Sequence, residues 1–396
     1  MLVNKMSQNL TIEFNILQYN VFARPHLLGY DGQQERLQRI PQALSQINNG
    51  KVDVIALCEV FSQVGESLAD MMLSEFNKYG FPYHTRVISG NALESVGGTM
   101  IVSKWPLLPP DGDTHVYRDM PTIDLEKFEA GLAEKAAAKG VIYAAVNKTE
   151  NGLTKTFHVF ATHLHAWDTE VAIGARRQQA HQMKEFLDKK NIPNNEPVIF
   201  AGDFNVDLVR CASEFKKLSQ ILDAKLPEII GEQKYTSDPS SNLLVGKDSA
   251  ADSCQEQYKN SWGEKSVIES RLFVIKDYLF NPAPQYKNSN PTPQKIPGLN
   301  PFFADPTKGS DTLYIEPGDC YCPCCRHEWL DYILFSKKHQ QPSGTTTLEC
   351  IRMKAASPFE ATWSSMLAAV AGVPDKIILS DLSDHYPVLS HFVFPA

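Results

Sequence analysis

Apolar and polar residues alternate near the start of the chain as they do in a half-buried strand. Between residues 10 and 22, Ile12, Phe14 and Ile16 are separated by single polar residues before the segment becomes largely apolar. Successive side chains of a strand point to opposite faces of a sheet, so a period of two puts one face in the interior. The pattern therefore predicts a first strand that runs into the core.

A helix and a second strand are predicted next along the chain. The apolar positions of residues 34–47 recur three or four residues apart, at Leu37, Ile40, Leu44 and Ile47. That spacing places them on one helical face. Residues 52–58 form a short apolar run of the kind that fills a buried strand. The opening order is therefore strand, helix, strand.

Further apolar runs predict strands later in the chain, and the amphipathic residues 175–189 predict a helix. The strand candidates are residues 98–103, 141–146, 156–162, 198–201, 329–335 and 386–393. Several of them follow one another with no helix between them, which favours two packed sheets flanked by helices over a regular strand-helix alternation. We therefore expect an α/β sandwich.

Residues 233–326 break this pattern because they are rich in Ser, Asn, Asp, Pro and Lys. The prolines of residues 281–306 are typical of an extended surface excursion. We interpret residues 10–396 as a single domain with an insertion at about 233–326, and not as two domains.

The composition of the 396 residues is close to the globular average, with 43% hydrophobic and 21% charged residues. The 38 basic and 46 acidic residues give a net charge of -8, which opposes a general attraction to nucleic acid. No stretch approaches the roughly 20 apolar residues that cross a bilayer, so we expect a soluble protein. The first residues lack the apolar segment of a secretory signal, so either no signal existed or it has been removed.

Four of the 8 cysteines crowd into residues 320–325. One short run can hardly surround a single zinc ion with four sulfurs, so zinc binding is the least favoured explanation. Disulfides, with Cys254 as one candidate partner, would suit an oxidising compartment, and a reduced cysteine-rich loop fits the sequence equally well. The sequence leaves these alternatives open.

Polar residues that can carry chemistry lie at the ends of the predicted strands. They are Asn20, Glu59, His163, Asp203, Asn205, Asp331, Asp384 and His385. Strand ends on one edge of a sheet can converge, and the oxygens of an amide and a carboxylate suit Mg²⁺. The two histidines have carboxylate neighbours and can transfer protons. Each residue alone is more often structural, but the ordered set predicts a catalytic site.

The order of these motifs resembles that of the endonuclease/exonuclease/phosphatase superfamily, which has the DNase I-like fold. Longer stretches are similar to the bacterial neutral sphingomyelinases (sphingomyelinase C) within it: residues 59–61, 97–106, 162–166, 190–196 and 383–388. The resemblance covers residues 10–394 apart from the insertion, so the single domain would be catalytic. It implies a four-layer α/β sandwich of two packed, mostly antiparallel sheets flanked by helices.

The resemblance also implies a metal-dependent phosphodiesterase that hydrolyses sphingomyelin to ceramide and phosphocholine. Its metal would be Mg²⁺, with Mn²⁺ or Co²⁺ as substitutes. In that scheme Glu59 holds the central ion, Asn20 lies close to the ion and the phosphate, and Asp384 lies beside the metal. A cation is chemically reasonable because a phosphodiester anion otherwise repels hydroxide.

The same resemblance implies roles for the remaining residues. Asp203 and Asn205 would position the attacking water or a second ion. His385 would act as the general base, oriented by Asp331. His163 would stabilise the charged phosphorane or assist the ceramide alkoxide in leaving.

Other activities on the same fold stay open. A phospholipase C or a phosphoinositide phosphatase is the first alternative, and a DNase I-like nuclease is less favoured because the net charge opposes it. A toxin with a dead site would need degraded motifs, and the motifs are intact.

We expect a monomer that contacts membranes peripherally, takes sphingomyelin as its lipid substrate and binds no nucleic acid. We expect it to be secreted or extracellular, acting on host-type membranes.

Two features of the bacterial sphingomyelinases transfer less directly. A second, edge metal site would fall at residues 62–63 and 94–96, which are poorer in carboxylates, so we expect it to be absent or altered. The paired aromatics that contact the membrane would correspond best to Phe302 and Phe303 in the insertion. Packing of both rings onto the core is an equally good explanation of that pair.

Overall fold

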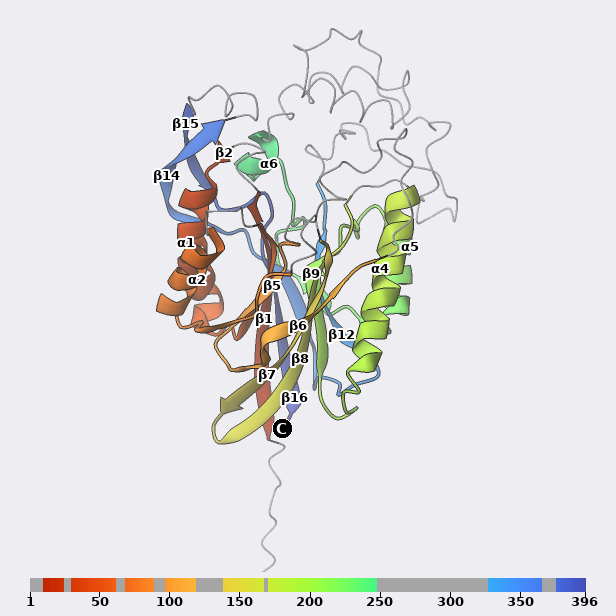
Figure 1. Ribbon diagram of the computed structural model, residues 1–396. Helices are drawn as coiled ribbons and strands as arrows, with labels where there is room; N and C mark the ends of the chain where they lie inside the picture. The colour runs from red at the N-terminus through yellow and green to blue at the C-terminus, as the bar shows by residue number, and fades with distance from the viewer. Residues whose placement is uncertain are drawn as a thin grey trace, which may run out of the picture.

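Two β-sheets face each other in the middle of the molecule, and helices cover their outer sides (Figure 1). This computed structural model describes residues 10–24, 30–61, 68–88, 97–118, 138–166, 170–247, 327–364 and 375–396. The strand pairs are mostly antiparallel. The predicted sandwich of two sheets flanked by helices is therefore confirmed.

The first sheet has seven strands in the order β11-β13-β16-β1-β3-β5-β4. Their bounds are β1 Thr11–Ala23, β3 Val54–Val60, β4 Tyr83–His84, β5 Met100–Ser103, β11 Glu228–Ile230, β13 Thr347–Cys350 and β16 Val388–Pro395. Strand β1 lies at the centre, parallel to β3 and antiparallel to β16. The strands predicted at residues 10–22, 52–58, 98–103 and 386–393 all belong to this sheet.

The second sheet has six strands in the order β10-β12-β9-β8-β7-β6. Their bounds are β6 Leu107–Val116, β7 Gly140–Glu150, β8 Leu153–His163, β9 Val198–Asp203, β10 Ala224–Lys225 and β12 Asp331–Ser336. Strand β8 is parallel to β9, and β12 is antiparallel to β9. This sheet contains the strands predicted at residues 141–146, 156–162, 198–201 and 329–335.

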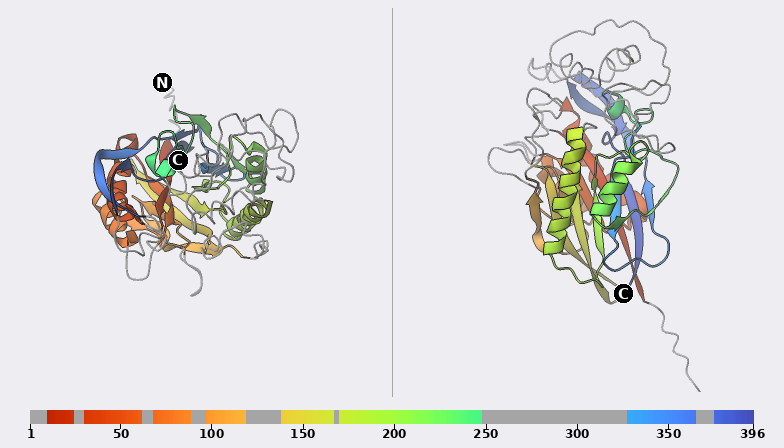
Figure 2. Two further views of the ribbon diagram at one scale, coloured as in Figure 1. Left: turned by 90° about the horizontal axis from the view of Figure 1, so that it is seen from above. Right: turned by 90° about the vertical axis from the view of Figure 1, so that its right-hand side faces the viewer.

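Helices α1, Gln33–Gln46, and α2, Leu68–Lys78, cover the first sheet, whereas α4, Glu170–Lys189, and α5, Ala212–Ile221, lie side by side over the second (Figures 1 and 2). The helices predicted at residues 34–47 and 175–189 are confirmed as α1 and α4. The sequence analysis did not predict α2 or α5, although the buried residues of α2 recur at helical spacing, at Ala69, Met72 and Phe76.

A small third sheet lies above α1 and has the order β15-β14-β2 (Figure 1). Its strands are β2 Tyr30–Asp31, β14 Lys354–Ser364 and β15 Asp375–Asp381. A 3-10 turn, Ile47–Gly50, follows α1, and the short helix α6 spans Leu243–Lys247. The sequence analysis missed β14 and β15 because they carry few consecutive apolar residues, and Ile378 of β15 is 62% exposed.

The alternation of β1 divides the core into two parts. Phe14 points between the two sheets, where its ring stacks on Phe157 of β8 with centroids 4.0 Å apart. Leu17 and Tyr19 belong instead to the cluster that includes Leu37 and other residues of α1. Because both faces of β1 are buried, the relative position of the two sheets at its carboxyl end is fixed by packing on both sides.

Several expectations fall outside the described residues: Phe302 and Phe303, the edge metal positions 62–63 and 94–96, Cys254, and the cysteines of residues 320–325. Cys58, Cys211 and Cys350, which are described, are buried, and Cys58 and Cys350 are free thiols. No helix in the described ranges is long and apolar enough to cross a membrane. The single-domain interpretation and the boundaries of the insertion stay predictions.

Candidate active site

The predicted polar residues meet because the carboxyl ends of two parallel strand pairs lie at the same end of the sandwich. Asn20 and Glu59 come from β1 and β3 of the first sheet. In the second sheet, His163 at the end of β8 is in register with Asp203 at the end of β9. Asp331, the first residue of antiparallel β12, pairs with Asp203 from the other side.

The backbone at Glu59 is bent toward this site. Glu59 has φ 58°, a left-handed conformation that is costly for a residue with a side chain. Gly98 accepts a hydrogen bond from Val60 N at 2.8 Å. A Cβ on Gly98, whose φ is 71°, would lie 3.1 Å from Glu59 Cα, so only glycine allows this close approach. Gly98 thus supports the unusual conformation of Glu59.

Asn20 links the two sheets through its side-chain amide. Its Nδ2 donates to Glu59 Oε1 at 2.9 Å and to Asp203 Oδ2 at 3.0 Å. Its Oδ1 accepts from Phe22 N at 3.0 Å, which fixes the orientation of the amide. Asn20 therefore presents its nitrogen, not its oxygen, to the two carboxylates and holds them side by side.

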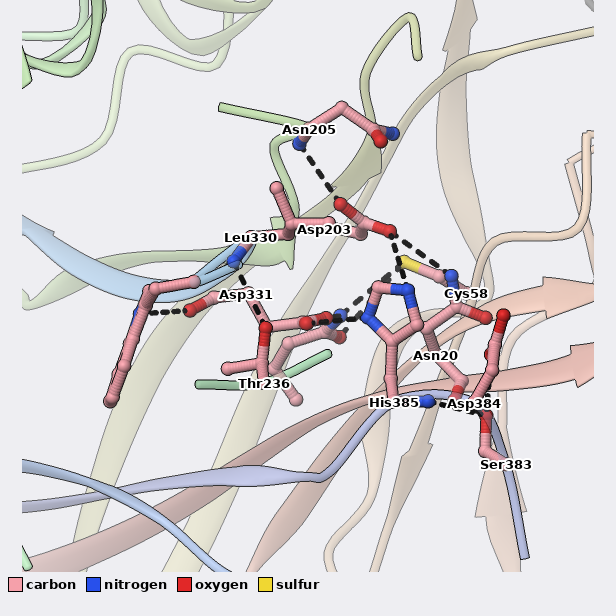
Figure 3. A network of polar contacts seen from close by, with 12 residues as sticks. Asn20, Cys58, Asp203, Asn205, Thr236, Leu330, Asp331, Ser383, Asp384 and His385 are labelled. Carbon is pink, nitrogen blue, oxygen red and sulfur yellow. Dashed lines mark hydrogen bonds and ion pairs between the residues drawn. The ribbon is translucent and has the colours of Figure 1, made fainter. Parts of the chain in front are cut away.

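His385 and Asp331 form a buried pair at the centre of the network (Figure 3). His385 Nδ1 donates to Asp331 Oδ2 at 2.7 Å, and Gln18 Nε2 donates to Asp331 Oδ1 at 2.9 Å. This pairing fixes the proton on Nδ1 and leaves Nε2 of the neutral ring as an acceptor. Nε2 lies 4.0 Å from Asp203 Oδ2, so it faces the shared carboxylate group.

His163 lies beside Asp203 on the side opposite Asp331, because β8 and β12 flank β9. Its Nε2 is 3.7 Å from Asp203 Oδ2 and 3.3 Å from Lys139 Nζ. Lys139 is buried and also donates to the backbone oxygen of Leu164 at 2.7 Å. Nδ1 of His163 is buried and has no hydrogen-bond partner among the described residues, which leaves it available to a ligand.

Asn205 holds the loop after β9. Its backbone N donates to Asp203 Oδ1 at 2.9 Å, and its Nδ2 donates to Leu164 O at 3.0 Å.

Asp384 accepts from Ser383 Oγ at 3.2 Å, and the same hydroxyl lies 2.6 Å from the backbone oxygen of Asn20 (Figure 3). All eight polar residues singled out in the sequence therefore come from segments that converge at this edge.

The carboxylates of the site are held with too little compensating positive charge. Burial raises the pKa of Glu59 to about 7, and the charge of Asp384 adds to the effect. Burial also raises the pKa of Asp203 to about 6, with a further contribution from Asp331. Both carboxylates are therefore expensive to ionise here, which is the condition that a bound cation relieves.

The two histidines are shifted in opposite directions. Burial alone would lower the pKa of His385, but the carboxylates of Asp331, Asp384 and Asp203 outweigh it and raise this pKa well above its ordinary value. Burial and the nearby Lys139 ammonium lower the pKa of His163 well below its ordinary value. His385 is thus built to take up a proton, and His163 is built to stay neutral.

The donor set fits a divalent cation. One ligand atom from each of Glu59, His163 and Asp203 lies within 4.8 Å of the others, and so does one from each of Asp203, Asp331 and His385. Within the described ranges Asp384 belongs to neither group, although its charge acts on Glu59. Glu59 with Asp203 supplies the hard oxygen ligands that Mg²⁺ prefers.

Sequence reasoning missed three residues of this network. Gln18 is a fully buried amide in an apolar strand, and that mismatch was the available signal. Lys139 precedes a strand and could not be distinguished from a surface lysine by sequence. Thr236, which accepts from Leu330 N at 2.9 Å, lies in the segment that was assigned to the insertion (Figure 3).

Comparison with known proteins finds one matching family and several similar proteins. The model of the Endonuclease/Exonuclease/phosphatase family matches residues 17–385. Sphingomyelinase C of Leptospira interrogans is 32% identical over 265 residues, which cover 62% of this chain and 42% of that protein. Sphingomyelinase C of Listeria ivanovii is 29% identical over 252 residues, which cover 59% of this chain and 67% of that protein. The chain thus spans less than half of the Leptospira relative.

Solved structures share the fold. Beta toxin from Staphylococcus aureus has a TM-score of 0.60 at 22% identity and covers 95% of this chain and 99% of its own. Sphingomyelinase C from Streptomyces griseocarneus has a TM-score of 0.59 at 21% identity, with 96% and 99% covered. The resemblance stated from the motifs is confirmed, including the DNase I-like sandwich. Because the family model covers nearly the whole chain, the protein belongs to the endonuclease/exonuclease/phosphatase family.

Proposed function

We propose that this protein is a metal-dependent phosphodiesterase that hydrolyses sphingomyelin to ceramide and phosphocholine. The similarity to proteins named sphingomyelinase C supports the choice of substrate. The observation that carries the reaction type is the His385–Asp331 pair, with Nε2 of His385 facing the carboxylate of Asp203. A base, its orienting carboxylate and a group of hard ligands are the parts that phosphodiester hydrolysis needs.

His385 would take the proton of the attacking water through Nε2. Its hydrogen bond to Asp331 stabilises the imidazolium that forms, and the raised pKa of His385 reflects the same interaction. Asp203, whose Oδ1 is held by Asn205 N, would orient that water. Removing the base would leave binding largely intact while slowing the chemical step.

His163 would act on the other side of the phosphate. Because its pKa is well below the ordinary value, the ring is neutral near pH 7 and can donate a hydrogen bond without carrying charge. Lys139 Nζ, 3.3 Å from Nε2 of His163, adds a fixed positive charge beside it. The pair would stabilise negative charge on the phosphate oxygens or on the leaving ceramide alkoxide.

Glu59 would hold Mg²⁺, with Asp203 nearby, Asn20 orienting both carboxylates and Asp384 beside the metal. The raised pKa values of Glu59 and Asp203 support this assignment. When bound, Mg²⁺ would neutralise the non-bridging oxygens of the phosphate and so lower the barrier to attack. Mn²⁺ and Co²⁺ are proposed as substitutes because they accept similar oxygen and nitrogen ligands.

The proposal includes the setting in which the enzyme works. A lipid substrate requires peripheral contact with a membrane, and the names of the relatives, which include a beta toxin, support a secreted or extracellular protein that acts on host-type membranes. We propose a monomer without a nucleic acid partner, since the net charge of -8 opposes binding to a phosphate backbone.

A substrate comparison tests the function directly. The protein is incubated with sphingomyelin, phosphatidylcholine, a phosphoinositide and plasmid DNA, each with Mg²⁺ or with a chelator. We expect phosphocholine release from sphingomyelin with Mg²⁺ only. Cleavage of phosphatidylcholine or of the phosphoinositide instead would favour the first alternative, and nicking of the plasmid would favour a nuclease. Full activity in chelator would remove the metal.

The membrane contact has its own test. We propose that Phe302 and Phe303 insert their rings into the lipid interface, which would contribute on the order of 3 kcal/mol. Changing both to alanine should then reduce binding to sphingomyelin liposomes and hydrolysis of bilayer substrate, while a soluble phosphocholine ester is cleaved as before. Equal losses on both substrates would assign the pair to packing.

A further inference from the structure

The bond between His385 and Asp331 spans the two sheets of the sandwich. Asp331 begins β12 in the six-stranded sheet, and His385 precedes β16 in the seven-stranded sheet. The two residues are 54 positions apart in the sequence, yet Nδ1 of His385 lies 2.7 Å from Oδ2 of Asp331. Their position along the chain alone does not fix this distance. The geometry of the pair therefore depends on what connects the two loops that carry it.

Residues 236–242, called the brace below, make that connection. Thr236 N donates to Glu328 O at 2.9 Å, and Thr236 Oγ1 accepts from Leu330 N at 2.9 Å, directly before Asp331. On the other side, Thr236 O accepts from Tyr386 N at 2.6 Å, directly after His385. One residue thus holds the backbone next to both members of the pair, and Figure 3 shows its contact with Leu330.

The far end of the brace grips the loop before His385. Asn242 Nδ2 donates to Ser383 O at 2.8 Å, and Tyr386 OH donates to Ser241 O at 2.9 Å. Thr236 is 0% exposed and Asn242 is 1% exposed, and the bond from Asn242 Nδ2 to Ser383 O is buried away from water. The brace therefore contacts the chain on both sides of His385 and immediately before Asp331.

We propose that Thr236 is a positioning residue for the general base: through the brace it holds His385 and Asp331 in register across the two sheets. Thr236 touches no reacting atom in this arrangement. The proposal rests on the proposed function, because its kinetic consequence requires His385 to be the base. Small displacements of a catalytic group are costly, since a shift of about 1 Å can lower a rate about 10²-fold.

Two substitutions at Thr236 separate its hydroxyl from its bulk. Thr236→Val keeps the shape and removes the acceptor for Leu330 N, whereas Thr236→Ser keeps the acceptor. We expect Thr236→Val to lower kcat by about 10- to 100-fold with KM changed less than about twofold. Thr236→Ser should recover most of that loss.

Thr85→Val is the matched control. Thr85 is also 0% exposed, and its Oγ1 accepts from a backbone donor, Ile101 N, at 3.0 Å. Thr85 lies outside the network of the site, so Thr85→Val should lower the melting temperature to a similar extent and leave kcat near that of the wild type. A kcat for Thr236→Val equal to that of Thr85→Val would overturn the proposal.

A double-variant comparison tests whether Thr236 acts through the pair. In the Asp331→Asn background the orienting carboxylate is already lost, so adding Thr236→Val should lower kcat by less than about twofold. A loss in this background as large as in the wild type would mean that Thr236 affects kcat independently of the His385–Asp331 pair, and the proposal would be wrong.

Proton NMR makes the test independent of the substrate. The Nδ1 proton of His385, bound to Asp331, should give a low-field resonance that disappears in His385→Ala. We expect it to move upfield in Thr236→Val but not in Thr236→Ser or Thr85→Val, and an unmoved resonance would count against the brace. If the variants show these shifts but the wild-type protein does not cleave sphingomyelin, the proposed function is contradicted and the brace is still supported.

Discussion

Replacing His385 with alanine is expected to lower kcat for sphingomyelin by about 10²- to 10⁴-fold while KM changes little. The imidazole is the group whose Nε2 faces Asp203 and whose Nδ1 is held at 2.7 Å by Asp331. Without it, water would have to lose its proton to solvent. Steady-state kinetics with and without Mg²⁺ would measure the effect.

His391→Ala is a suitable control because His391 also pairs through Nδ1, with Asn15 Oδ1 at 2.8 Å, but lies along β16 away from the site. Its kcat should stay close to that of the wild type. If His385→Ala keeps more than roughly a tenth of the wild-type rate, His385 is not the base.

Asp331→Asn should reveal the same pair through its pH dependence. If His385 is the base, as proposed, activity requires its neutral form, so the rate should rise with pH as this residue loses its proton. Asp331 is one of the carboxylates that raise the pKa of His385, and its removal lowers that pKa. The midpoint of the rising limb should therefore move to lower pH, while the maximal rate falls because the ring is no longer oriented.

Sequence predicts where most of the strands lie along the chain and which polar residues stand at their ends, because both depend on local signals. Alternation fixes β1, and the parallel pairs β1–β3 and β8–β9 bring their carboxyl ends to one edge. Asn20, Glu59, His163 and Asp203 follow from that rule. The third sheet escapes it, since β14 and β15 are partly exposed and the apolar run of β15 is only three residues long, Ile377–Leu379.

The supporting residues could not be predicted in the same way, because their roles depend on contacts between distant segments. Gln18 reaches Asp331 across 313 residues of sequence, and Lys139 reaches His163 only once β7 and β8 have paired. Asn20 offers its amide nitrogen, a choice set by the Phe22 N–H that occupies its oxygen. No pattern of residue types contains that information.

Glu59→Gln is expected to weaken Mg²⁺ binding and to lower kcat/KM by about 10³-fold, a loss of several kcal/mol of transition-state stabilisation. Glu59 and Asp203 are the carboxylates joined through Asn20 Nδ2, so removing one charge halves the formal charge of that pair. Titration calorimetry with Mg²⁺ and steady-state kinetics would measure both effects. Glu185→Gln, on an exposed position of α4, is the control for loss of a negative charge elsewhere.

Without the metal, the same substitution, Glu59→Gln, is expected to stabilise the fold. Burial raises the pKa of Glu59 from 4.5 to about 7, so the folded state favours the protonated carboxyl. Ionisation of the Glu59 carboxyl therefore lowers the stability of the fold as the pH rises from about 4.5 to 7, by on the order of 3 kcal/mol. At pH 8 in chelator, Glu59→Gln should therefore melt at a higher temperature than the wild type.

Mg²⁺ should raise the melting temperature of the wild type and leave the variant almost unchanged, because only the wild type gains the stabilisation of a bound ligand. A variant that is destabilised in chelator and still stabilised by Mg²⁺ would show that Glu59 is a structural carboxylate and that the ion binds elsewhere.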